Sequence, residues 1–502
     1  MISGINRLVR FILLLCLLTK EALSLESCSL SEEQSKAPDP NLKVLKYNVG
    51  DGVDTFLAYL PPDVSTFYQI GPHVTAKEVR PRHDGIGAKF INLSNHVVNV
   101  FWEPKTNDFD HGKAVVIRNV PAFAAKGTSS FPGHSFVFAS EDGTFLQRII
   151  VDPIDGSLHS YDPYYAVNDE KATLSNIERE LSQQERALYW KWRKTLRFDT
   201  FYRNFTGRSY LATFPRKPPM HFMWPAQYFQ QKHWVTTGET HFLTAPPKFL
   251  ETTVPLEKRL DDEPVALKEY RTDEPFLNMT LTVVSCEPRV FEILDFLSPA
   301  EVEHVLEIAQ MLTLKESLLG DEQSTSRTTR TSSNTWVRRS QSAVIDAIYR
   351  RAADLMRIDE ALMRPRAENE KFNIPPDRPS INHSIAEDLQ LVHYAPGQEY
   401  QTHHDFGYQP LSDAADPARF ATLLLYLNED LEGGETSFPK FSNAHTFLEL
   451  KVKPEIGKAV LFYSQLPDGN MDELSQHRAH PVRIGEKWLI NLWVWDPLKR
   501  MD

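Results

Sequence analysis

The chain has 502 residues, of which 41% are hydrophobic and 24% are charged, and its formal net charge is -12 at pH 7. A chain of this length is too long to fold around a single hydrophobic core, so we expect two or three domains. The composition is ordinary for a soluble protein. The negative charge argues against nucleic acid as a partner, because phosphate backbones are bound by basic surfaces.

The N-terminus has the pattern of a secretory signal peptide, which we assign to residues 1–24. Arg7 and Arg10 precede the apolar run 11–18, and the small residues Ala22 and Ser24 follow. The run is short for a bilayer span, so we expect no stable membrane span, with a retained anchor as the alternative. Triplets for N-glycosylation agree with this route and begin at Asn92, Asn204, Asn278 and Asn382. The expected location is the endoplasmic reticulum lumen or the cell exterior.

The chain contains three cysteines, and Cys16 lies inside the signal segment. Cys28 and Cys286 therefore remain in the mature chain. Two cysteines do not form a disulfide framework, so a single bridge and two separate thiols are both consistent with the sequence.

The predicted organisation begins with a β-sandwich over residues 25–165. Short apolar runs between 42 and 153 alternate with Gly, Pro and Asn turns, which is typical of short antiparallel strands. Residues 166–287 are predicted to be a connecting region, with one long helix over 174–196. Prolines are dense between 204 and 264. They disfavour regular ladders, so we expect this stretch to lie over a neighbouring domain.

The last predicted domain covers 288–502 and opens with a strand followed by a helix. Ser298 is a suitable N-cap, Pro299 suits the first helical position, and Glu301 completes a capping box. A second helix is predicted over 342–356, and the polar, proline-bearing stretch 363–387 is predicted to be a surface loop.

Two histidines and an aspartate have the spacing of a metal site. Side chains at i and i+2 of a strand point the same way, so His403 and Asp405 can face one metal. His477 follows 72 positions after Asp405, on a later strand, and completes a set of two imidazoles and one carboxylate. Non-haem Fe(II) oxygenases use this set because it leaves open positions on the metal. A His-x-Asp pair alone is common, so its interpretation depends on the surrounding sequence.

The surrounding blocks resemble the prolyl 4-hydroxylase family. They include Arg-Thr-Ser-Ser-Asn-Thr-Trp at 330–336, Gly-Gly-Glu-Thr-Ser-Phe-Pro at 433–439, His-Arg-Ala-His-Pro at 477–481 and Gly-Glu-Lys-Trp at 485–488. The resemblance covers about 288–502 in order and spacing. It implies a mainly β fold with flanking helices, in which a double-stranded β-helix, or jelly roll, follows the N-terminal sandwich.

The resemblance also implies cofactors and residue roles. Fe(2+) is expected on His403, Asp405 and His477, with 2-oxoglutarate as co-substrate and L-ascorbate as reductant. Lys487 is expected to bind the far carboxylate of 2-oxoglutarate, with help from Tyr394 and Thr436. Arg419 and Trp493 match positions near the family's substrate cleft. We expect no catalytic residues beyond these metal and co-substrate ligands, and His480 is expected to stay off the metal.

The implied activity is hydroxylation of a proline-containing polypeptide, procollagen-like or other, at C4 of proline, with release of succinate and CO2. One alternative is hydroxylation of another residue or of a small molecule, because the superfamily shares the same ligands. Another alternative is an inactive scaffold that binds hydroxyproline. The sequence implies no particular oligomeric state.

A second, shorter resemblance is to the β domain of the von Hippel-Lindau protein, over about 85–150. It is carried by Lys-Phe-Ile-Asn-Leu-Ser-Asn at 89–95 and by Phe-Pro-Gly-His-Ser-Phe at 131–136. That domain binds hydroxyproline in a small pocket, whose positions are taken in this chain by Trp102, Ser130 and His134. Ile117 stands where that family has a pocket Tyr. The alternative is a sandwich in which these side chains have only structural roles.

Overall fold

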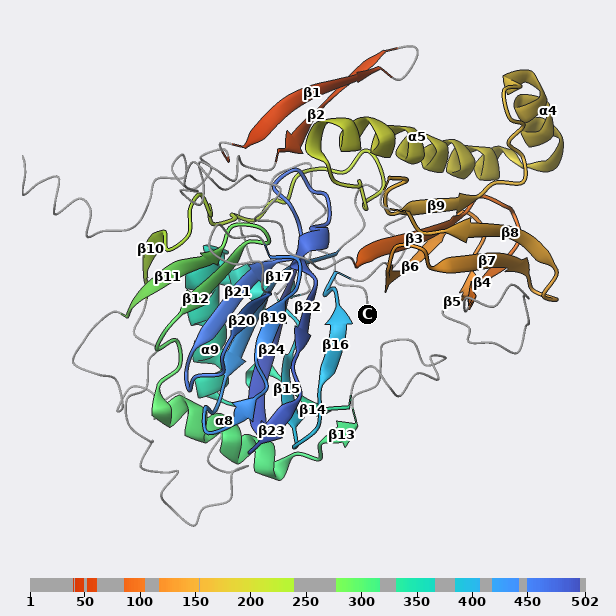
Figure 1. The fold of residues 1–502 in the computed structure, drawn as a ribbon. Coiled ribbons are helices and arrows are strands. Elements are labelled where there is room, and N and C mark those ends of the chain that lie inside the picture. Colours follow the sequence, from red (N-terminus) through yellow and green to blue (C-terminus); the bar gives the residue numbers. More distant parts are fainter. Residues whose placement is uncertain are drawn as a thin grey trace, which may run out of the picture.

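The computed structural model describes residues 39, 41–48, 52–60, 85–103, 117–152, 154–238, 277–316, 331–365, 384–406, 418–441 and 449–496. These residues form a smaller β-rich body and a larger one, and a long helix runs alongside the smaller body (Figure 1). Both bodies are mainly β with flanking helices, as predicted. No helix in the described ranges has the length and apolar character that a membrane crossing requires.

The smaller body is a sandwich of two sheets with strand orders β6-β3-β9 and β5-β4-β7-β8. Its strands are β3 (Ile86–Asn92), β4 (Val98–Glu103), β5 (Ile117–Val120), β6 (Ala125–Ser130), β7 (Ser135–Ser140), β8 (Phe145–Ile150) and β9 (Leu158–Tyr161). Phe90 of one sheet packs against Phe136 of the other, with ring centroids 4.7 Å apart. Inward-facing apolar side chains of this kind form the core between stacked sheets.

The first hairpin lies outside this sandwich, which corrects the prediction that the strands after residue 42 belong to it. Strands β1 (Leu42–Asn48) and β2 (Val53–Tyr59) pair only with each other. Their aromatic residues pack on helix α5 (Gln183–Thr206), where Phe56 and Phe198 have ring centroids 4.5 Å apart. The hairpin buries its apolar face against this helix instead of against a sheet.

The helical region consists of two helices, so the prediction of one helix over 174–196 was wrong. Helix α4 (Glu170–Glu180) ends at Leu181, whose backbone is extended. Ser182 then caps α5, because its side chain accepts from the Glu185 backbone amide while the Glu185 carboxylate accepts from the Ser182 amide. This reciprocal capping box starts a new helix in the middle of an otherwise helical composition.

The proline-rich stretch lies across the larger body, as its composition predicts. The Trp224 indole donates to Leu355 O at 2.8 Å, and the Met220 backbone amide donates to Asp496 Oδ2 at 2.7 Å. Residues 239–264, the later part of the stretch, lie outside the described residues.

The larger body is built on a nine-stranded antiparallel sheet in the order β10-β11-β12-β21-β17-β24-β15-β14-β13, and a second sheet has the order β16-β22-β19-β20. The first sheet comprises β10 (Lys232–Thr236), β11 (Asn278–Ser285), β12 (Val290–Ile293), β13 (Lys315–Glu316), β14 (Ser333–Val337), β15 (Leu389–Tyr394), β17 (Ala418–Tyr426), β21 (Ala459–Tyr463) and β24 (Lys487–Asp496). The second comprises β16 (Tyr400–His403), β19 (Thr436–Phe438), β20 (Leu450–Val452) and β22 (His477–Ala479), and β18 (Glu432–Gly433) pairs with β23 (Val482–Ile484).

This sheet begins before the predicted boundary at 288. Strand β11 pairs with β12, and β10 pairs with β11, so residues from the connecting region extend the edge of the sheet. The apolar side chains Met279, Leu281 and Val283 alternate along β11 and are buried in the main core. Their period of two is the strand signal that the sequence analysis did not use.

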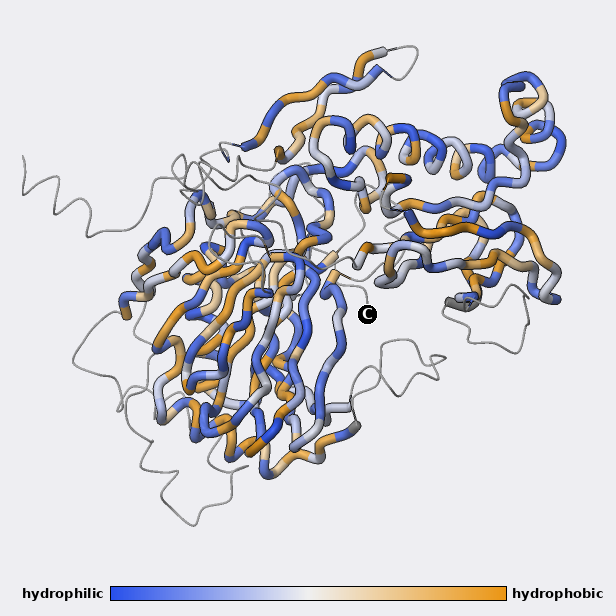
Figure 2. The backbone as a smooth tube through the Cα atoms, in the orientation of Figure 1, coloured by the Kyte–Doolittle hydropathy of each residue, from blue (hydrophilic) through white to orange (hydrophobic). Residues whose placement is uncertain are grey.

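Helices α8 (Pro299–Met311) and α9 (Ala343–Met356) cover the outer face of the large sheet. The predicted capping box of Ser298 and Glu301 is present, with Pro299 in the first turn. Short 3-10 turns are η2 (Arg339–Gln341), η3 (Glu360–Met363) and η4 (Glu473–Ser475). Hydrophobic residues concentrate along the central strands of this body (Figure 2).

Candidate active site and metal centre

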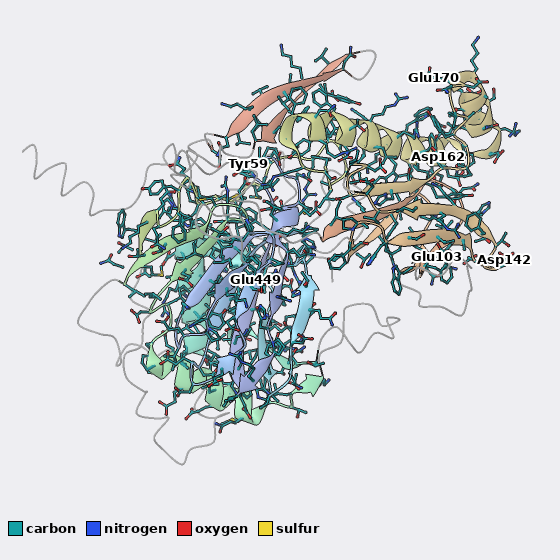
Figure 3. All side chains as sticks on the ribbon, viewed as in Figure 1. Tyr59, Glu103, Asp142, Asp162, Glu170 and Glu449 are labelled. Carbon is teal, nitrogen blue, oxygen red and sulfur yellow. The ribbon has the colours of Figure 1, made fainter. Side chains whose placement is uncertain are left out.

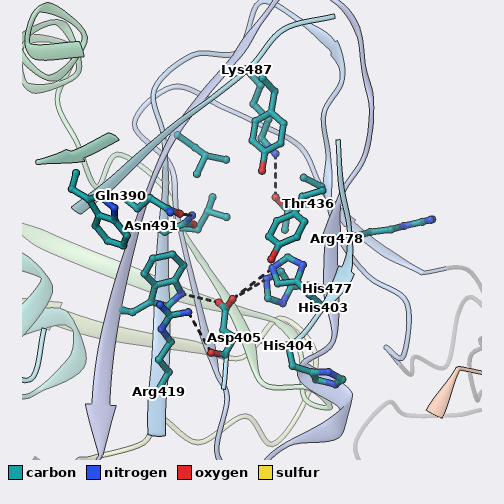
Figure 4. Close-up of a pocket in the computed structure, with 17 residues that line it drawn as sticks. Gln390, His403, His404, Asp405, Arg419, Thr436, His477, Arg478, Lys487 and Asn491 are labelled. Atoms are coloured by element: carbon teal, nitrogen blue, oxygen red, sulfur yellow. Dashed lines mark hydrogen bonds and ion pairs between the residues drawn. The ribbon is translucent and has the colours of Figure 1, made fainter. Parts of the chain in front are cut away.

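A cavity of about 250 Å³ lies between the two sheets of the larger body. Strands β15, β17 and β24 of the large sheet and β16, β19 and β22 of the small sheet contribute its walls. The three candidate metal ligands lie at one end and Lys487 lies at the other (Figure 4). The strand pairing therefore places all of these predicted residues in one cavity.

His403, Asp405 and His477 form a cluster whose ligand atoms all lie within 4.8 Å of one another. His403 ends β16 and His477 begins β22, and the two residues are direct cross-strand partners. Asp405 follows two residues after His403, and its Oδ1 lies 3.6 Å from His403 Nε2 and 3.7 Å from His477 Nε2. The three atoms thus converge on one point, which suits a single metal ion.

Hydrogen bonds behind the two imidazoles orient them. His403 Nδ1 donates to Gln401 O at 2.8 Å, and His477 Nδ1 donates to Ser475 O at 3.0 Å. A carbonyl oxygen only accepts, so each Nδ1 carries the proton and each Nε2 presents its lone pair to the cluster. This tautomer is the one that a metal-ligating imidazole needs.

The carboxylate of Asp405 is fixed in the same manner. Its Oδ2 accepts from Thr422 Oγ1 at 2.6 Å and from the Trp493 indole at 3.0 Å, which leaves Oδ1 facing the histidines. Burial raises the pKa of Asp405, but His477, His403, Arg419 and the Thr422 hydroxyl outweigh it and bring the pKa below its usual range. Asp405 is therefore ionised, as a metal ligand must be.

Arg419 and Trp493, both predicted near the substrate, are arranged around Asp405. The Arg419 guanidinium stacks 3.8 Å above the Trp493 ring and donates to Asp405 O at 3.4 Å. It is also held by both oxygens of Glu387, at 2.7 and 3.1 Å. Trp493 thus supports the ligand carboxylate directly, while both side chains also line the cavity. The predicted contact with substrate stays a prediction.

Glu387 was not predicted to be a site residue, because it lies at the end of the stretch predicted to be a surface loop. Its carboxylate is buried and also accepts from the Trp495 indole at 2.8 Å. Glu387 lies two residues before β15, and β24 separates β15 from β17, the strand that carries Arg419. No local pattern in the sequence points to this contact.

Lys487 is fully buried at the other end of the cavity, with 0% of its surface exposed. Its Nζ donates to Thr436 Oγ1 at 3.4 Å and lies 5.4 Å from the Tyr394 ring centroid. Within the described ranges, no carboxylate lies within ion-pair distance of Nζ. Burial lowers the pKa of Lys487 to about 7, although Glu435 raises it in part. A buried ammonium without a carboxylate partner is costly, and an anionic ligand relieves that cost.

Tyr426, which was not predicted from the sequence, is fully buried and contacts Thr436 at this end of the cavity without lining it. Its hydroxyl donates to Thr436 Oγ1 at 2.8 Å, and its ring centroid lies 5.5 Å from Lys487 Nζ. Thr436 therefore accepts from both Tyr426 and Lys487, so its own hydroxyl proton is available to a ligand. The chemistry of this end suits a carboxylate.

Comparison with known proteins agrees with this geometry. Residues 389–495 match the family model of the 2OG-Fe(II) oxygenase superfamily. The chain is 34% identical over 226 residues to probable prolyl 4-hydroxylase 3 of Arabidopsis thaliana, which covers 42% of this chain and 71% of the relative. The chain belongs to the prolyl 4-hydroxylase family. It is also 31% identical to prolyl 4-hydroxylase subunit alpha-1 of Gallus gallus, over 41% of this chain and 36% of that protein.

Among solved structures, this family member is similar to the viral collagen prolyl hydroxylase of Paramecium Bursaria Chlorella virus-1. The two share 26% sequence identity, covering 41% of this chain and 95% of that chain, with a TM-score of 0.29. Together with the family match, the ligand cluster identifies a 2-oxoglutarate-dependent dioxygenase, and the family implies Fe(2+) and 2-oxoglutarate as its cofactors.

Two further histidines of this chain lie near the ligands but do not face the metal cluster. His404 Nε2 donates to Glu473 O at 2.9 Å. His480 Nε2 lies 3.0 Å from Ser437 Oγ and 3.2 Å from Glu449 Oε1, which agrees with the prediction that it stays off the metal.

The three candidate hydroxyproline-binding residues of the sandwich do lie together. Ser130 Oγ is 3.3 Å from His134 Nδ1, and the rings of Trp102 and His134 have centroids 5.8 Å apart. Phe136, the cross-strand partner of Trp102, is buried in the core of the sandwich. The side chain of Ile117 lies outside the described part of the chain.

The two donors to Asp405 provide the first prediction. Trp493→Phe and Thr422→Val should each weaken Fe(II) binding about 10- to 100-fold, because the carboxylate loses a bond that orients it. Phe keeps an aromatic face for the Arg419 guanidinium but has no N–H, so the change chiefly removes the indole donor. Anaerobic calorimetry with Fe(II) measures the affinity, with thermal unfolding as a control for folding. Wild-type affinity in both variants would remove this support role.

Proposed function

We propose that this protein hydroxylates C4 of prolyl residues in a polypeptide, consuming 2-oxoglutarate and O2 and releasing succinate and CO2. One observation carries the proposal: the His403, Asp405 and His477 cluster and the buried ammonium of Lys487 lie at opposite ends of one cavity. The curated relatives described above, which are named prolyl 4-hydroxylases, support proline as the modified residue.

The residues of the chain have separate tasks in this proposal. Iron(II) with 2-oxoglutarate supplies the oxidation of an unactivated C–H bond. His403, Asp405 and His477 hold the metal on one face, and Lys487 and Thr436 bind the far carboxylate of the co-substrate. The buried strands around them exclude water from the site. L-ascorbate is included in the proposal as the reductant that keeps the iron ferrous.

A coupled assay tests the proposal. Full-length protein with Fe(II), ascorbate and 2-oxoglutarate should release succinate faster with a proline-rich peptide than with the same peptide carrying alanine at each proline. Equal stimulation by both peptides would favour hydroxylation of another residue, and stimulation only by a small molecule would favour a small-molecule substrate. A protein that releases no succinate under any of these conditions would support the inactive scaffold.

We also propose that the protein passes through the secretory pathway, as segment 1–24 predicts. The burial of the acceptor asparagines determines which of them could carry a glycan on this route. Asn92 is fully buried, and its amide donates to the carbonyls of His96, Val120 and Pro121 at 2.6, 3.0 and 3.0 Å. Asn204 and Asn278 are exposed. Asn382 lies outside the described residues.

Protein made in a secreting eukaryotic cell should therefore carry glycans on Asn204 and Asn278 and none on Asn92. A glycan on Asn92 would displace three hydrogen bonds in the sandwich core, so a chain modified there should not fold. Peptide mapping before and after enzymatic deglycosylation measures the occupancy of each site. Unmodified Asn204 and Asn278 would count against passage through the pathway, and a folded protein glycosylated at Asn92 would contradict the packing argument.

A second candidate function is binding of hydroxyproline by the sandwich, favoured by the contact of Ser130, His134 and Trp102. Such a site would let one chain modify a peptide and retain the modified product. Full-length protein without iron should then bind a hydroxyproline peptide more tightly than its proline twin in calorimetry. His134→Ala should remove the difference. Equal affinity of the wild-type protein for both peptides would leave the sandwich a structural role.

A further inference from the structure

The segment between β21 and β22, Ser464–Gln476, leads directly into the metal ligand His477. We call it the 464–476 loop. It folds back on itself, with Leu466 N donating to Asn470 O at 2.7 Å and Asp472 N donating to Ser464 O at 2.9 Å. Its polar side chains are buried: Gln465, Asp468, Asn470, Asp472 and Gln476. A polar loop this deeply buried requires partners from other parts of the molecule.

Many of those partners come from the N-terminal half of the chain. Asp468 Oδ2 accepts from the Tyr59 amide of the hairpin at 2.8 Å and from the Tyr202 hydroxyl of α5 at 2.6 Å. Arg208 pairs with Asp472 at 2.9 Å. Tyr59 lies where the hairpin meets the larger body (Figure 3). These contacts join residues separated by more than 250 positions in the sequence.

Asn470 and Gly469 fasten the tip of the loop to the connecting segment. Asn470 Oδ1 accepts from Leu211 N at 2.8 Å, and its amide donates to Ser209 O at 2.9 Å. Gly469 has φ of +90°, and a side chain there would overlap the Lys217 carbonyl oxygen. The loop is therefore closely fitted to this surface as well.

Glu473 connects the loop to the sandwich. Its carboxylate accepts from the Gly87 amide at 2.6 Å, from Ser157 Oγ at 3.3 Å and from Lys440 Nζ at 2.9 Å. Burial raises the pKa of this carboxyl, but Lys440 and the Gly87 amide outweigh that effect and keep the pKa below its ordinary value. The group is thus an ionised carboxylate held by Lys440 of the larger body and by two donors from the sandwich, the Gly87 amide and the Ser157 hydroxyl.

The loop also contacts both segments that supply the metal ligands. Ser475 O accepts from His477 Nδ1, and Glu473 O accepts from the Nε2 of His404, the neighbour of His403. Gln476, next to His477, donates to Ser129 Oγ of the sandwich at 2.7 Å. A shift of the loop would therefore move a hydrogen-bond acceptor on each side of the metal site.

We propose that the N-terminal half of the chain positions the iron ligands through the 464–476 loop, with Glu473 as the main positioning residue. The inference rests on the proposed iron site. It assigns the sandwich a role in metal binding that is independent of any peptide. Hydrogen bonds behind a ligand commonly contribute to metal affinity, and here they originate in a different domain.

Serine substitutions inside the sandwich test this without touching the dioxygenase domain. Ser129→Ala and Ser157→Ala, combined in the full-length chain, remove hydroxyls that contact Gln476 and Glu473. Ser135→Ala is the matched control, because its hydroxyl donates to Glu103 within the sandwich at 2.7 Å. Calorimetry with Fe(II) in the absence of O2 reports metal affinity, and hydrogen exchange reports the stability of the 464–476 loop.

We expect the double variant and Glu473→Gln to bind Fe(II) about 10-fold more weakly and to exchange faster over the loop, with the control like wild type. Wild-type affinity and exchange in the double variant would overturn the inference, as would an equal loss in Ser135→Ala. His477→Ala separates the two proposals. If it fails to weaken Fe(II) binding, the proposed iron site itself is wrong; if it weakens binding while the sandwich variants do not, only this inference is wrong.

Discussion

Alanine at His403, Asp405 or His477 is expected to abolish substrate-dependent succinate release. Each side chain supplies one of the three atoms that converge within 4.8 Å, and no other described His, Cys, Asp or Glu joins that cluster. The loss should exceed the roughly 10- to 100-fold effect of removing a hydrogen bond behind a ligand. Succinate release measures turnover, and Fe(II) calorimetry should show the same loss of affinity.

His480→Ala is the matched control for these variants. It removes an imidazole three residues after His477, whose ring contacts Ser437 and Glu449 and not the metal cluster. The control should keep most of the wild-type turnover. Near-normal succinate release from a variant of His403, Asp405 or His477 would remove that residue from the ligand set.

Lys487→Ala is expected to raise the KM for 2-oxoglutarate about 10- to 100-fold, with little change in Fe(II) affinity. A hydrogen bond to a charged group contributes about 1.5–3 kcal/mol, and tenfold in affinity corresponds to about 1.4 kcal/mol. Lys487→Arg should not restore binding, because the guanidinium is larger and planar and the ammonium site is fully enclosed. An unchanged KM in Lys487→Ala would refute the assignment.

The same lysine predicts a pH dependence. Burial lowers its pKa to about 7 in the protein without co-substrate, so the ammonium needed to bind a carboxylate is lost as the pH rises above that value. The KM for 2-oxoglutarate should therefore increase from pH 7 to pH 9. Co-substrate affinity that rises over this range would contradict the role of the charged form.

Over the same pH range, the folding stability of the protein without co-substrate should increase, whereas its affinity for 2-oxoglutarate should fall. The unfolded lysine has a pKa of about 10.4, so between about pH 7 and 10 the unfolded chain holds the extra proton and this group makes the folded protein more stable as pH rises. Lys487→Met should remove that contribution. Chemical unfolding at several pH values, without 2-oxoglutarate, measures the difference between the two proteins.

The metal site was predictable from sequence because its geometry follows from strand rules. The i, i+2 spacing of His403 and Asp405 places both on one face, and the resemblance supplied His477 as the third ligand and Lys487 as the co-substrate residue. The residues behind them were not predictable. Glu387, Tyr426 and Thr422 reach the site through pairing between distant strands, and a single sequence contains no record of that pairing.

In the fold too, features set by local sequence patterns were predictable, and contacts between distant elements were not. The capping box at Ser298 and the apolar alternation of the sandwich are local signals, and both appear in the structure. The first hairpin was misplaced because its alternation indicates a strand but not its partner, which is helix α5. The break at Ser182 was missed because helical composition continues on both sides, although the Ser-x-x-Glu pattern of a capping box was present.

Mass spectrometry of a proline-rich peptide after incubation with the full-length protein, Fe(II), ascorbate and 2-oxoglutarate tests the central claim most directly. The peptide should gain one oxygen on proline, and its hydrolysate should contain 4-hydroxyproline in step with the succinate released. Neither product should form with the His477→Ala variant. Succinate released by the wild-type protein with the hydroxyl on another residue, or with no change in any proline peptide, would contradict prolyl 4-hydroxylation as the function of this chain.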